Sequence, residues 1–145
     1  MFILDTNVVS ELRKAKTGKA DRSVVAWASS VSSGSLFLSA ITVLELETGV
    51  LQKERSDPVQ GGLLRAWLES HVLPAFQGRV LPVDTAVALR CAKLHIPYPR
   101  AERDALIAAT ALVHGMTVVT RNVSDFVSTG VSLLNPWAGS EALSH

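Results

Sequence analysis

The sequence predicts an α/β fold of three layers, in which helices cover both faces of a central parallel sheet of five strands. Short apolar runs alternate with longer segments of helical periodicity along the chain. The chain has 145 residues, of which 48% are hydrophobic, so a single domain can bury a core on both faces of its sheet. We expect that domain to span residues 1–137 and a frayed tail to follow over 138–145.

The strands are expected at five short apolar runs, each bounded by polar or turn-forming residues. They are residues 2–4, 36–38, 79–83, 117–120 and 131–134. Helical segments separate most of these runs, as the crossovers of a parallel sheet require.

Several of the helices have recognisable ends. Asp57 followed by Pro58 is typical of an N-cap with proline in the first turn, and Asp84 precedes another helix in the same way. Gly115 ends an apolar helix that opens at Asp104 and should lie buried against the sheet. The expected helices are residues 8–13, 24–31, 41–53, one that opens at 57–58, 84–94 and 104–114.

Four acidic residues, Asp5, Glu45, Asp104 and Asp125, fall where a predicted strand ends or a helix begins. Open parallel sheets bind ligands beyond the carboxyl ends of their strands, so acids far apart in the sequence can meet there. Carboxylate oxygens are ligands that Mg²⁺ prefers, and Mg²⁺ in turn holds substrate phosphates. The pattern therefore indicates a site for Mg²⁺, with Mn²⁺ as the alternative ion.

Each acid also has a purely structural interpretation. Asp5 alone can be the N-cap of the helix that follows it. Asp104 alone can complement the dipole of its helix. Asn122 and Asp125 have the spacing of a capping box, in which the first residue caps a helix and the second bonds back to it.

Glu45 has a competitor, because Glu47 is two residues away. Helical periodicity from Ile41 places Leu44, Leu46 and Leu51 on one broad apolar arc, with Glu47 inside that arc and Glu45 roughly opposite. Periodicity therefore does not select Glu45 as a ligand, and Glu47 is left as a candidate for a partner surface.

Four segments resemble, in the same order, the motifs of PIN-domain nucleases and, within them, the VapC-type toxins of type II toxin-antitoxin pairs. They are LDTN at 4–7, TVLEL at 42–46, DALIAATA at 104–111 and TRNVSDF at 120–126. The likeness extends from Met1 to about Trp137. One departure is the stretch before Asp104, which carries Pro97 and Pro99 where relatives more often have a glycine-containing loop.

The resemblance implies a PIN-like fold and an endoribonuclease that depends on Mg²⁺ or Mn²⁺ and acts as a toxin. Asp5, Glu45, Asp104 and Asp125 would hold the metal, which would activate a water for attack on an RNA phosphodiester. The resemblance also implies a homodimer, with a small DNA-binding antitoxin whose tail occupies the groove of the active site. The N-terminus lacks the pattern of a signal peptide and Cys91 has no disulfide partner, so we expect the protein in the cytoplasm.

Other polar residues are expected around the acids. Thr6, Asn7, Thr120 and Asn122 are candidates for hydrogen bonds to the carboxylates and bound waters, with turn and cap chemistry as the alternative. Arg13, Lys14, Arg103 and Arg121 are candidate phosphate contacts. With the four acids set aside, 14 basic residues face nine acidic ones, a balance that suits a polyanionic substrate.

Two other classes of function compete with the nuclease. A phospho-acceptor or aspartyl phosphatase domain also has an aspartate after its first strand, but Asn7 stands where such proteins have a second acid. A catalytically silent PIN-like binding module is the second. The three tryptophans are expected as core or interface anchors, and Cys91 has no disulfide partner in this chain.

Overall fold

The structure is a computed structural model that describes residues 1–137, so the expected tail over 138–145 lies outside the described residues. A five-stranded sheet in the order β3-β2-β1-β4-β5 forms its centre, and every neighbouring pair is parallel. The strands are β1 (Phe2–Leu4), β2 (Leu36–Ser39), β3 (Val80–Leu81), β4 (Thr117–Val119) and β5 (Leu133–Leu134). The predicted fold class and the parallel five-stranded sheet are confirmed.

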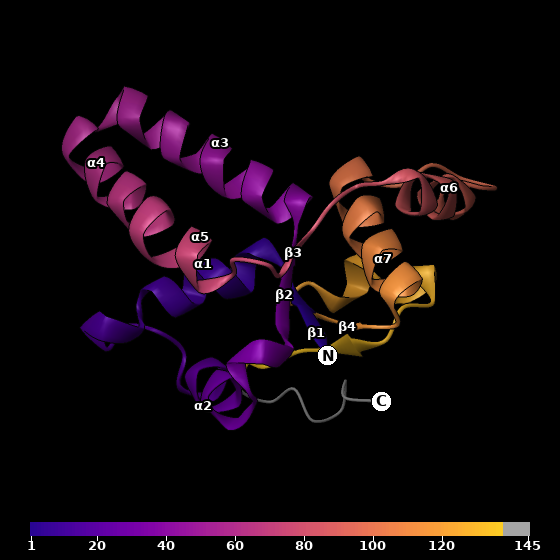
Figure 1. Cartoon of the computed structure of the whole chain (residues 1–145), viewed down its shortest axis with the longest axis horizontal. Helices are drawn as coiled ribbons and strands as arrows, with labels where there is room; N and C mark the ends of the chain where they lie inside the picture. The colour runs from indigo at the N-terminus through magenta and orange to yellow at the C-terminus, as the bar shows by residue number, and fades with distance from the viewer. Residues whose placement is uncertain (138–145) are drawn as a thin grey trace.

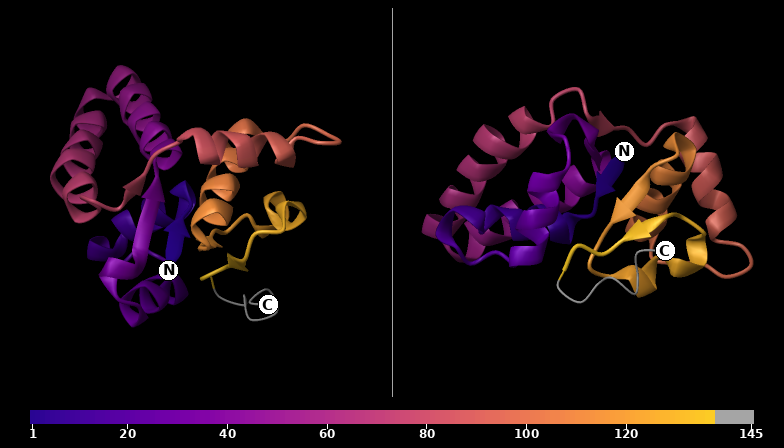
Figure 2. Two further views of the ribbon diagram at one scale, coloured as in Figure 1. Left: turned by 45° about the vertical axis from the view of Figure 1, so that its right-hand side comes forward. Right: turned by 90° about the horizontal axis from the view of Figure 1, so that it is seen from below.

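Helices cover both faces of the sheet (Figure 1). They are α1 (Thr6–Arg13), α2 (Arg22–Ser30), α3 (Ala40–Ser56), α4 (Pro58–Trp67), α5 (Leu73–Ala75), α6 (Thr85–Leu94) and α7 (Glu102–His114). A π-helical turn, η3 (Leu68–Val72), joins α4 to α5, and short 3-10 turns η4 (Val123–Asp125) and η5 (Val127–Thr129) follow β4. The long helices α3 and α4 lie side by side in both views of Figure 2.

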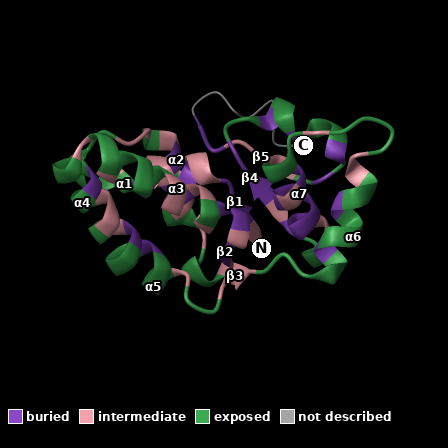
Figure 3. Ribbon diagram, turned by 90° about the horizontal axis from the view of Figure 1, so that it is seen from above, coloured by how far each residue is buried: buried purple, intermediate pink, exposed green. Residues whose placement is uncertain are grey.

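The core has one part on each side of the sheet, because successive side chains of a strand point to opposite faces. Leu4 of β1 packs with α1, α2 and α3, whereas Ile3 packs with α7 and Phe126. A third, smaller cluster joins α6 to α7 through Val87 and Cys91. Figure 3 shows the resulting pattern, with buried residues concentrated in the central strands and α7.

Several predicted boundaries shift, each for a local reason. The helix expected from residue 8 begins at Thr6, because the side chain of Asp5 caps it directly after β1. The strand expected over 79–83 shortens to Val80–Leu81, since Pro82 has no N–H for the ladder. The helix expected from Asp104 begins at Glu102, which places Asp104 inside its first turn.

The apolar arc predicted for α3 is wider than the face that α3 buries. Leu46 and Val50 lie in the core, but Leu44 and Leu51 remain 47% and 53% exposed. Val59 and Leu63 of α4 are also exposed. Within residues 1–137, the α3–α4 pair thus leaves several large apolar side chains exposed. Within residues 1–137, no helix combines the length and apolar character needed to cross a membrane.

Candidate active site

Asp5 lies at the centre of the site, immediately after β1. Its backbone N–H donates to Val119 O of β4 (2.9 Å), so the sheet itself fixes its position. The side chain caps α1 through Oδ1, which accepts the Thr6 N–H at 2.8 Å, while Oδ2 accepts the Thr120 hydroxyl at 2.8 Å. The capping interpretation of Asp5 is therefore correct, and it leaves the second oxygen directed toward β4.

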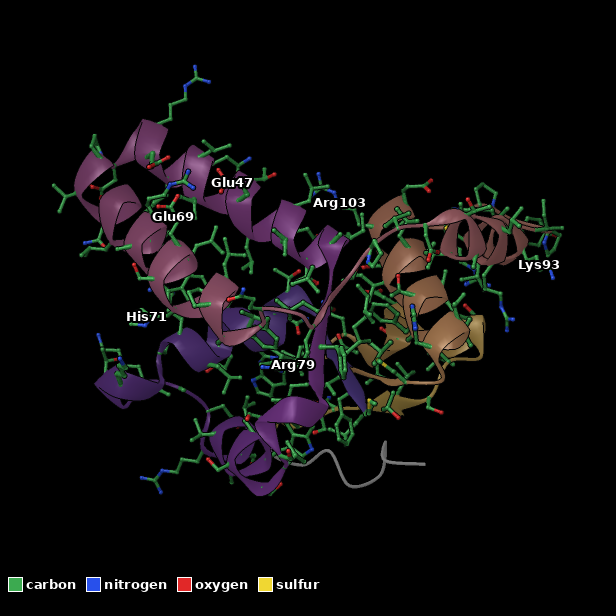
Figure 4. All side chains as sticks on the ribbon, in the orientation of Figure 1. Glu47, Glu69, His71, Arg79, Lys93 and Arg103 are labelled. Atoms are coloured by element: carbon green, nitrogen blue, oxygen red, sulfur yellow. The ribbon has the colours of Figure 1, made fainter. Side chains whose placement is uncertain are left out.

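Glu45 reaches the same place from the first half of α3. Its Oε1 accepts the hydroxyl of Thr6 at 2.6 Å, and its Oε2 lies 3.8 Å from Arg103 Nη1 of α7. Figure 4 labels Arg103 at the end of α7 that lies near α3. Glu47 points elsewhere, since both of its oxygens accept from the Arg65 guanidinium at 2.7 and 2.9 Å. The structure thus places Glu45, and not Glu47, beside Asp5.

Asp104 and Asp125 come from the other half of the chain. Asp104 lies in the first turn of α7, and among the described residues its carboxylate accepts no hydrogen bond. Asp125 ends the 3-10 turn η4 and is exposed at the rim. The capping-box interpretation was wrong, because Asn122 makes no side-chain cap bond to the 3-10 turn that follows it.

These side chains surround an open pocket of about 450 Å³ at the carboxyl ends of β1 and β4. Three of the four predicted acids line it, and Asp125 stands close enough to act on them electrostatically. The pocket is lined by Asp5, Thr6, Asn7, Ser10, Glu11, Lys14, Glu45, Asp104, Arg121, Asn122 and Trp137.

The acids repel one another in the protein without a cation. Burial, and after it the negative charges of Asp5, Asp125 and Glu45, raise the pKa of Asp104 to about 6. Burial likewise raises the pKa of Asp5, although its hydrogen bonds with Thr120 and Thr6 oppose the shift. Folding therefore brings together carboxylates whose charges the chain leaves partly uncompensated.

The predicted polar neighbours form a connected hydrogen-bond chain around Asp5. Asn7 Nδ2 lies 3.4 Å from Asp5 Oδ2 and 3.5 Å from Thr120 Oγ1. Thr120 Oγ1 in turn accepts the backbone N–H of Asn122 at 3.0 Å. Thr6, Asn7 and Thr120 thus contact the acids directly, whereas Asn122 lines the pocket and contacts Asp5 only through Thr120. Asn7 donates where a phospho-acceptor domain would supply a second acid.

The predicted phosphate contacts separate into two groups. Lys14 and Arg121 line the pocket, and Arg103 stands over Glu45. Arg13 lies outside it, with its guanidinium carbon 5.9 Å from the centre of the Trp67 ring. Arg13 instead lines a neighbouring hollow of about 210 Å³ that shares Thr6, Ser10 and Glu45 with the main pocket.

The Pro97–Pro99 loop turns away from the pocket. Arg100, which follows it, donates from Nε to Leu94 O at 2.5 Å and from its guanidinium to Ser128. Arg100 therefore ties the loop to η5, and it is not one of the pocket residues.

Sequence reasoning missed three residues of the pocket, Ser10, Glu11 and Trp137. Trp137 was assigned to the core or an interface, yet it follows β5 at the edge of the sheet where β1 and β4 also end. Its position after a strand was the signal available in the sequence. Glu11 belongs to the wall rather than to the acid group, because it accepts the Asp21 N–H and pairs with Lys14 at 3.2 Å.

The donor set of the pocket fits a hard divalent cation. It offers carboxylate oxygens from Asp5, Glu45 and Asp104, which come from three separate segments, and Asp104 has both oxygens free of hydrogen bonds within residues 1–137. Asp5 and Glu45 each keep oxygens that neighbouring hydroxyls orient. Nitrogen or sulfur ligands, which zinc favours, do not line this pocket.

A second group of metal-type side chains lies between α6 and α7. Cys91 Sγ is 3.7 Å and Glu102 Oε2 is 3.5 Å from His95 Nε2. However, His95 Nδ1 accepts the Arg100 N–H at 3.1 Å, so the proton of the neutral ring belongs on Nε2, the atom that a metal would need. We therefore interpret this group as a polar contact that joins the two helices.

Comparisons with known proteins agree with this geometry. The family model described as PIN domain matches residues 2–129. VapC ribonuclease Y4jK of Sinorhizobium fredii is 40% identical over 142 residues, covering 94% of this chain and 98% of that protein. Toxin FitB of Neisseria gonorrhoeae is 38% identical, covering 94% and 99%.

Solved structures match over similar lengths. The crystal structure of FitAcB from Neisseria gonorrhoeae has a TM-score of 0.85 at 38% identity and covers 95% of this chain and 99% of its own. The structure of FitAB bound to an IR36 DNA fragment gives 0.81 at 37% identity, covering 94% and 96%. With a family model over most of its length and relatives of this similarity, the chain belongs to the PIN domain family.

Proposed function

We propose that this protein is an endoribonuclease that depends on Mg²⁺ or Mn²⁺ and acts as the toxin of a toxin-antitoxin pair. The observation that carries the proposal is the group of four carboxylates that meet after β1, in α3, in α7 and in η4. Burial raises the pKa of Asp104 to about 6, together with the negative charges of the other three acids. The names of full-length relatives, a VapC ribonuclease and Toxin FitB, support the same class of activity.

Asp5, Glu45, Asp104 and Asp125 would hold the ion. When bound, it would supply a Lewis acid that lowers the pKa of a water and stabilises charge on the reacting phosphate. Hydrogen bonds within the protein would orient the ligands of the ion. Thr120 and Asn7 hold Asp5 through Oδ2, and Thr6 orients Glu45 through Oε1. Because the attacking group is a water, no side chain has to become a nucleophile.

The basic residues of the pocket would receive the RNA backbone. Lys14 and Arg121 stand on the wall formed by α1 and the segment after β4, away from α3. Arg103 is 3.8 Å from Glu45 and both reduces the negative charge there and can approach a phosphate. A polyanion can enter only after the acids are neutralised, so substrate binding and cation binding should depend on each other.

The surface beside the acids suits an antitoxin tail. The hollow lined by Thr6, Glu45 and Trp67 continues into a more apolar one of about 150 Å³ beside Trp67, Val72 and Phe76. An extended segment lying along these hollows would cover the acids at one end. One similar structure is titled as FitAB bound to a DNA fragment, which supports a DNA-binding antitoxin partner.

A homodimer is supported by the uncovered apolar residues of the α3–α4 pair. Leu44 and Leu51 of α3 and Val59 and Leu63 of α4 are all at least 47% exposed, more apolar surface than a small monomer needs to leave in water. Light scattering at micromolar concentration should give a dimer mass, and a monomer mass would contradict this part of the proposal.

The function is tested by incubating the pure protein with a panel of cellular RNAs in Mg²⁺, in Mn²⁺ and in EDTA, and by mapping the cut ends. Cleavage at defined sites in either metal but not in EDTA is the expected result. Cleavage that continues undiminished in EDTA would contradict the role of the ion, and intact RNA in both metals would contradict the nuclease.

A further inference from the structure

Arg121 and Trp137 form a stacked pair in the wall of the pocket. The guanidinium carbon of Arg121 lies 5.3 Å from the centre of the Trp137 ring. Both side chains line the pocket that contains Asp5, Glu45 and Asp104. The phosphate contact proposed for Arg121 depends only on its charge, and it does not explain why the guanidinium lies over the Trp137 ring.

Both members of the pair are held in place. The Arg121 N–H donates to Asn7 Oδ1 at 3.3 Å, and the next N–H, of Asn122, donates to Thr120. Trp137 is only 9% exposed, packs in the core cluster on the α1 face, and its N–H donates to Asn135 Oδ1 at 3.0 Å. The backbone of Arg121 and the ring of Trp137 are therefore both anchored beside the pocket.

The charge of Arg121 is free among the described residues. Lys14 pairs with Glu11 at 3.2 Å and Arg103 approaches Glu45 at 3.8 Å, but Arg121 has no carboxylate within 4.0 Å in residues 1–137. Arg121 is exposed, and its charge helps to lower the pKa of Glu11 at the pocket mouth, after the Asp21 N–H and Lys14. The Trp137 ring lies on one side of the guanidinium, and the Arg121 side chain is otherwise exposed at the pocket wall.

We propose that the exposed guanidinium of Arg121 stacks on an unpaired nucleobase next to the cleaved phosphate, and that Trp137 positions it there. A guanidinium is planar and weakly hydrated, so a base can stack on it as on an aromatic ring. In a duplex the bases are paired and stacked on each other, so this contact selects RNA that is single-stranded at the cut. The inference rests on the proposed function, since it names the substrate class of the same site.

The matched variant is Arg121→Lys, which keeps the positive charge and loses the plane. On an oligoribonucleotide that the wild type cuts, loss of one stacked base costs about tenfold in binding. We therefore expect Arg121→Lys to raise KM about tenfold at nearly constant kcat. When a nucleotide flanking the cut is made abasic, we also expect the KM of the wild type to rise by the same factor. The KM of the variant should not rise further. Arg121→Ala should lose more, because it removes the charge as well.

Three results would overturn the stacking role. The first is an Arg121→Lys protein that cleaves like the wild type. The second is an equal abasic penalty in the wild type and in Arg121→Lys. The third is a wild type that cuts duplex as well as single-stranded RNA. Melting curves test whether Arg121→Lys folds like the wild type. Trp137→Phe keeps a ring under the guanidinium, so its KM should still rise when the flanking nucleotide is made abasic.

A binding measurement separates this inference from the nuclease itself. In an Asp104→Asn background, fluorescence anisotropy of a labelled single-stranded RNA reports affinity without cleavage. Adding Arg121→Lys should weaken binding about tenfold for intact RNA and leave binding to the abasic RNA unchanged. If the wild type cuts no RNA, the proposed function fails, and equal affinities here would separately overturn the stacking role.

Discussion

Helix α3 carries two glutamates, two residues apart, in opposite electrostatic surroundings. Glu47 accepts two hydrogen bonds from Arg65, which also pairs with Glu54 at 3.1 Å and with Glu69 at 3.5 Å. Figure 4 labels Glu47 on α3 and Glu69 on the continuation of α4. Glu45 instead lies near Asp5 and Asp104, and Arg103 approaches it only to 3.8 Å.

The glutamates around Arg65 and the acids of the pocket differ in how far neighbouring arginines neutralise their charge. The hydrogen bonds from Arg65 lower the pKa of Glu47, as expected for a group whose charge contributes to packing α3 against α4. At the strand ends, burial and mutual repulsion raise the pKa of Asp104 to about 6. Arg65 lies within reach of three glutamates, whereas Asp5 and Asp104 have no arginine within 4.0 Å among residues 1–137. This difference favours an external cation as the partner of the pocket acids.

The largest expected effect is on catalysis. Asp104→Asn removes a carboxylate that accepts no hydrogen bond in residues 1–137, so its loss should reduce metal-dependent RNA cleavage by about 100-fold or more, beyond the usual effect of changing a supporting residue. Expression of the wild type without a partner should slow growth, and Asp104→Asn or Asp5→Asn should relieve it. Equal toxicity of all three proteins would contradict the nuclease account.

Asp125→Ala should remove most of the stabilisation that Mg²⁺ gives. At tenfold excess over its dissociation constant, Mg²⁺ should stabilise the wild type by about 1.4 kcal/mol, or roughly 3–5 °C in melting temperature. Because Asn122 makes no side-chain cap bond to start η4, the variant should melt in EDTA at or above the wild-type temperature. Parallel shifts of the two proteins with Mg²⁺ would mean that Asp125 does not contact the ion.

Without metal, Asp104→Asn should stabilise the protein at neutral pH. The pKa of Asp104 in the folded state, about 6, exceeds its ordinary value of 3.8, so the folded form binds more protons and loses stability as pH rises through this window. After discounting for solvent screening, the gain is about 1 kcal/mol, or roughly 3 °C, at pH 7.5 in EDTA. The gain should shrink at pH 5, and a constant difference at both pH values would contradict the raised pKa.

Glu47→Gln should have the smallest effect. The side chain remains able to accept from Arg65, and the pair is partly exposed, so the melting temperature should fall by about 2 °C at most. RNA cleavage and the Mg²⁺-induced shift should match the wild type. A loss of cleavage in this variant, with a normal melting curve, would mean that the Arg65 group and the pocket are not independent.

The order of strands and helices was readable from the sequence because it depends on local periodicity and caps. Asp57 and Asp84 cap their helices as predicted, accepting from Gln60 and Val87 N–H groups. The choice between Glu45 and Glu47 was not readable from periodicity, because α3 has two buried sides, one against the sheet and one against α4. Only the position of Arg65, 18 residues beyond Glu47, explains why a glutamate lies inside the apolar arc.

Pocket residues that belong to motifs at strand ends could be predicted from the sequence. Pocket residues whose position depends on long-range packing could not. Asp5 and Thr120 meet because β1 and β4 are neighbours in a parallel sheet. Trp137 could not be assigned to the pocket by residue type, since a tryptophan has a large apolar surface for a core and a ring for stacking. Residue type alone was equally ambiguous for Trp27, which packs edge-on against Phe2 in the core, with the ring centroids 5.2 Å apart.

The most direct test of the account is Mn²⁺ binding by the pair Glu45→Gln and Glu47→Gln, followed by electron paramagnetic resonance. The two variants remove the same charge from the same helix, two residues apart. We predict that Glu45→Gln weakens Mn²⁺ binding by about tenfold or more, as expected for loss of a ligand, and that Glu47→Gln binds like the wild type. Equal affinities in the two variants would contradict the claim that the pocket carboxylates hold the catalytic ion.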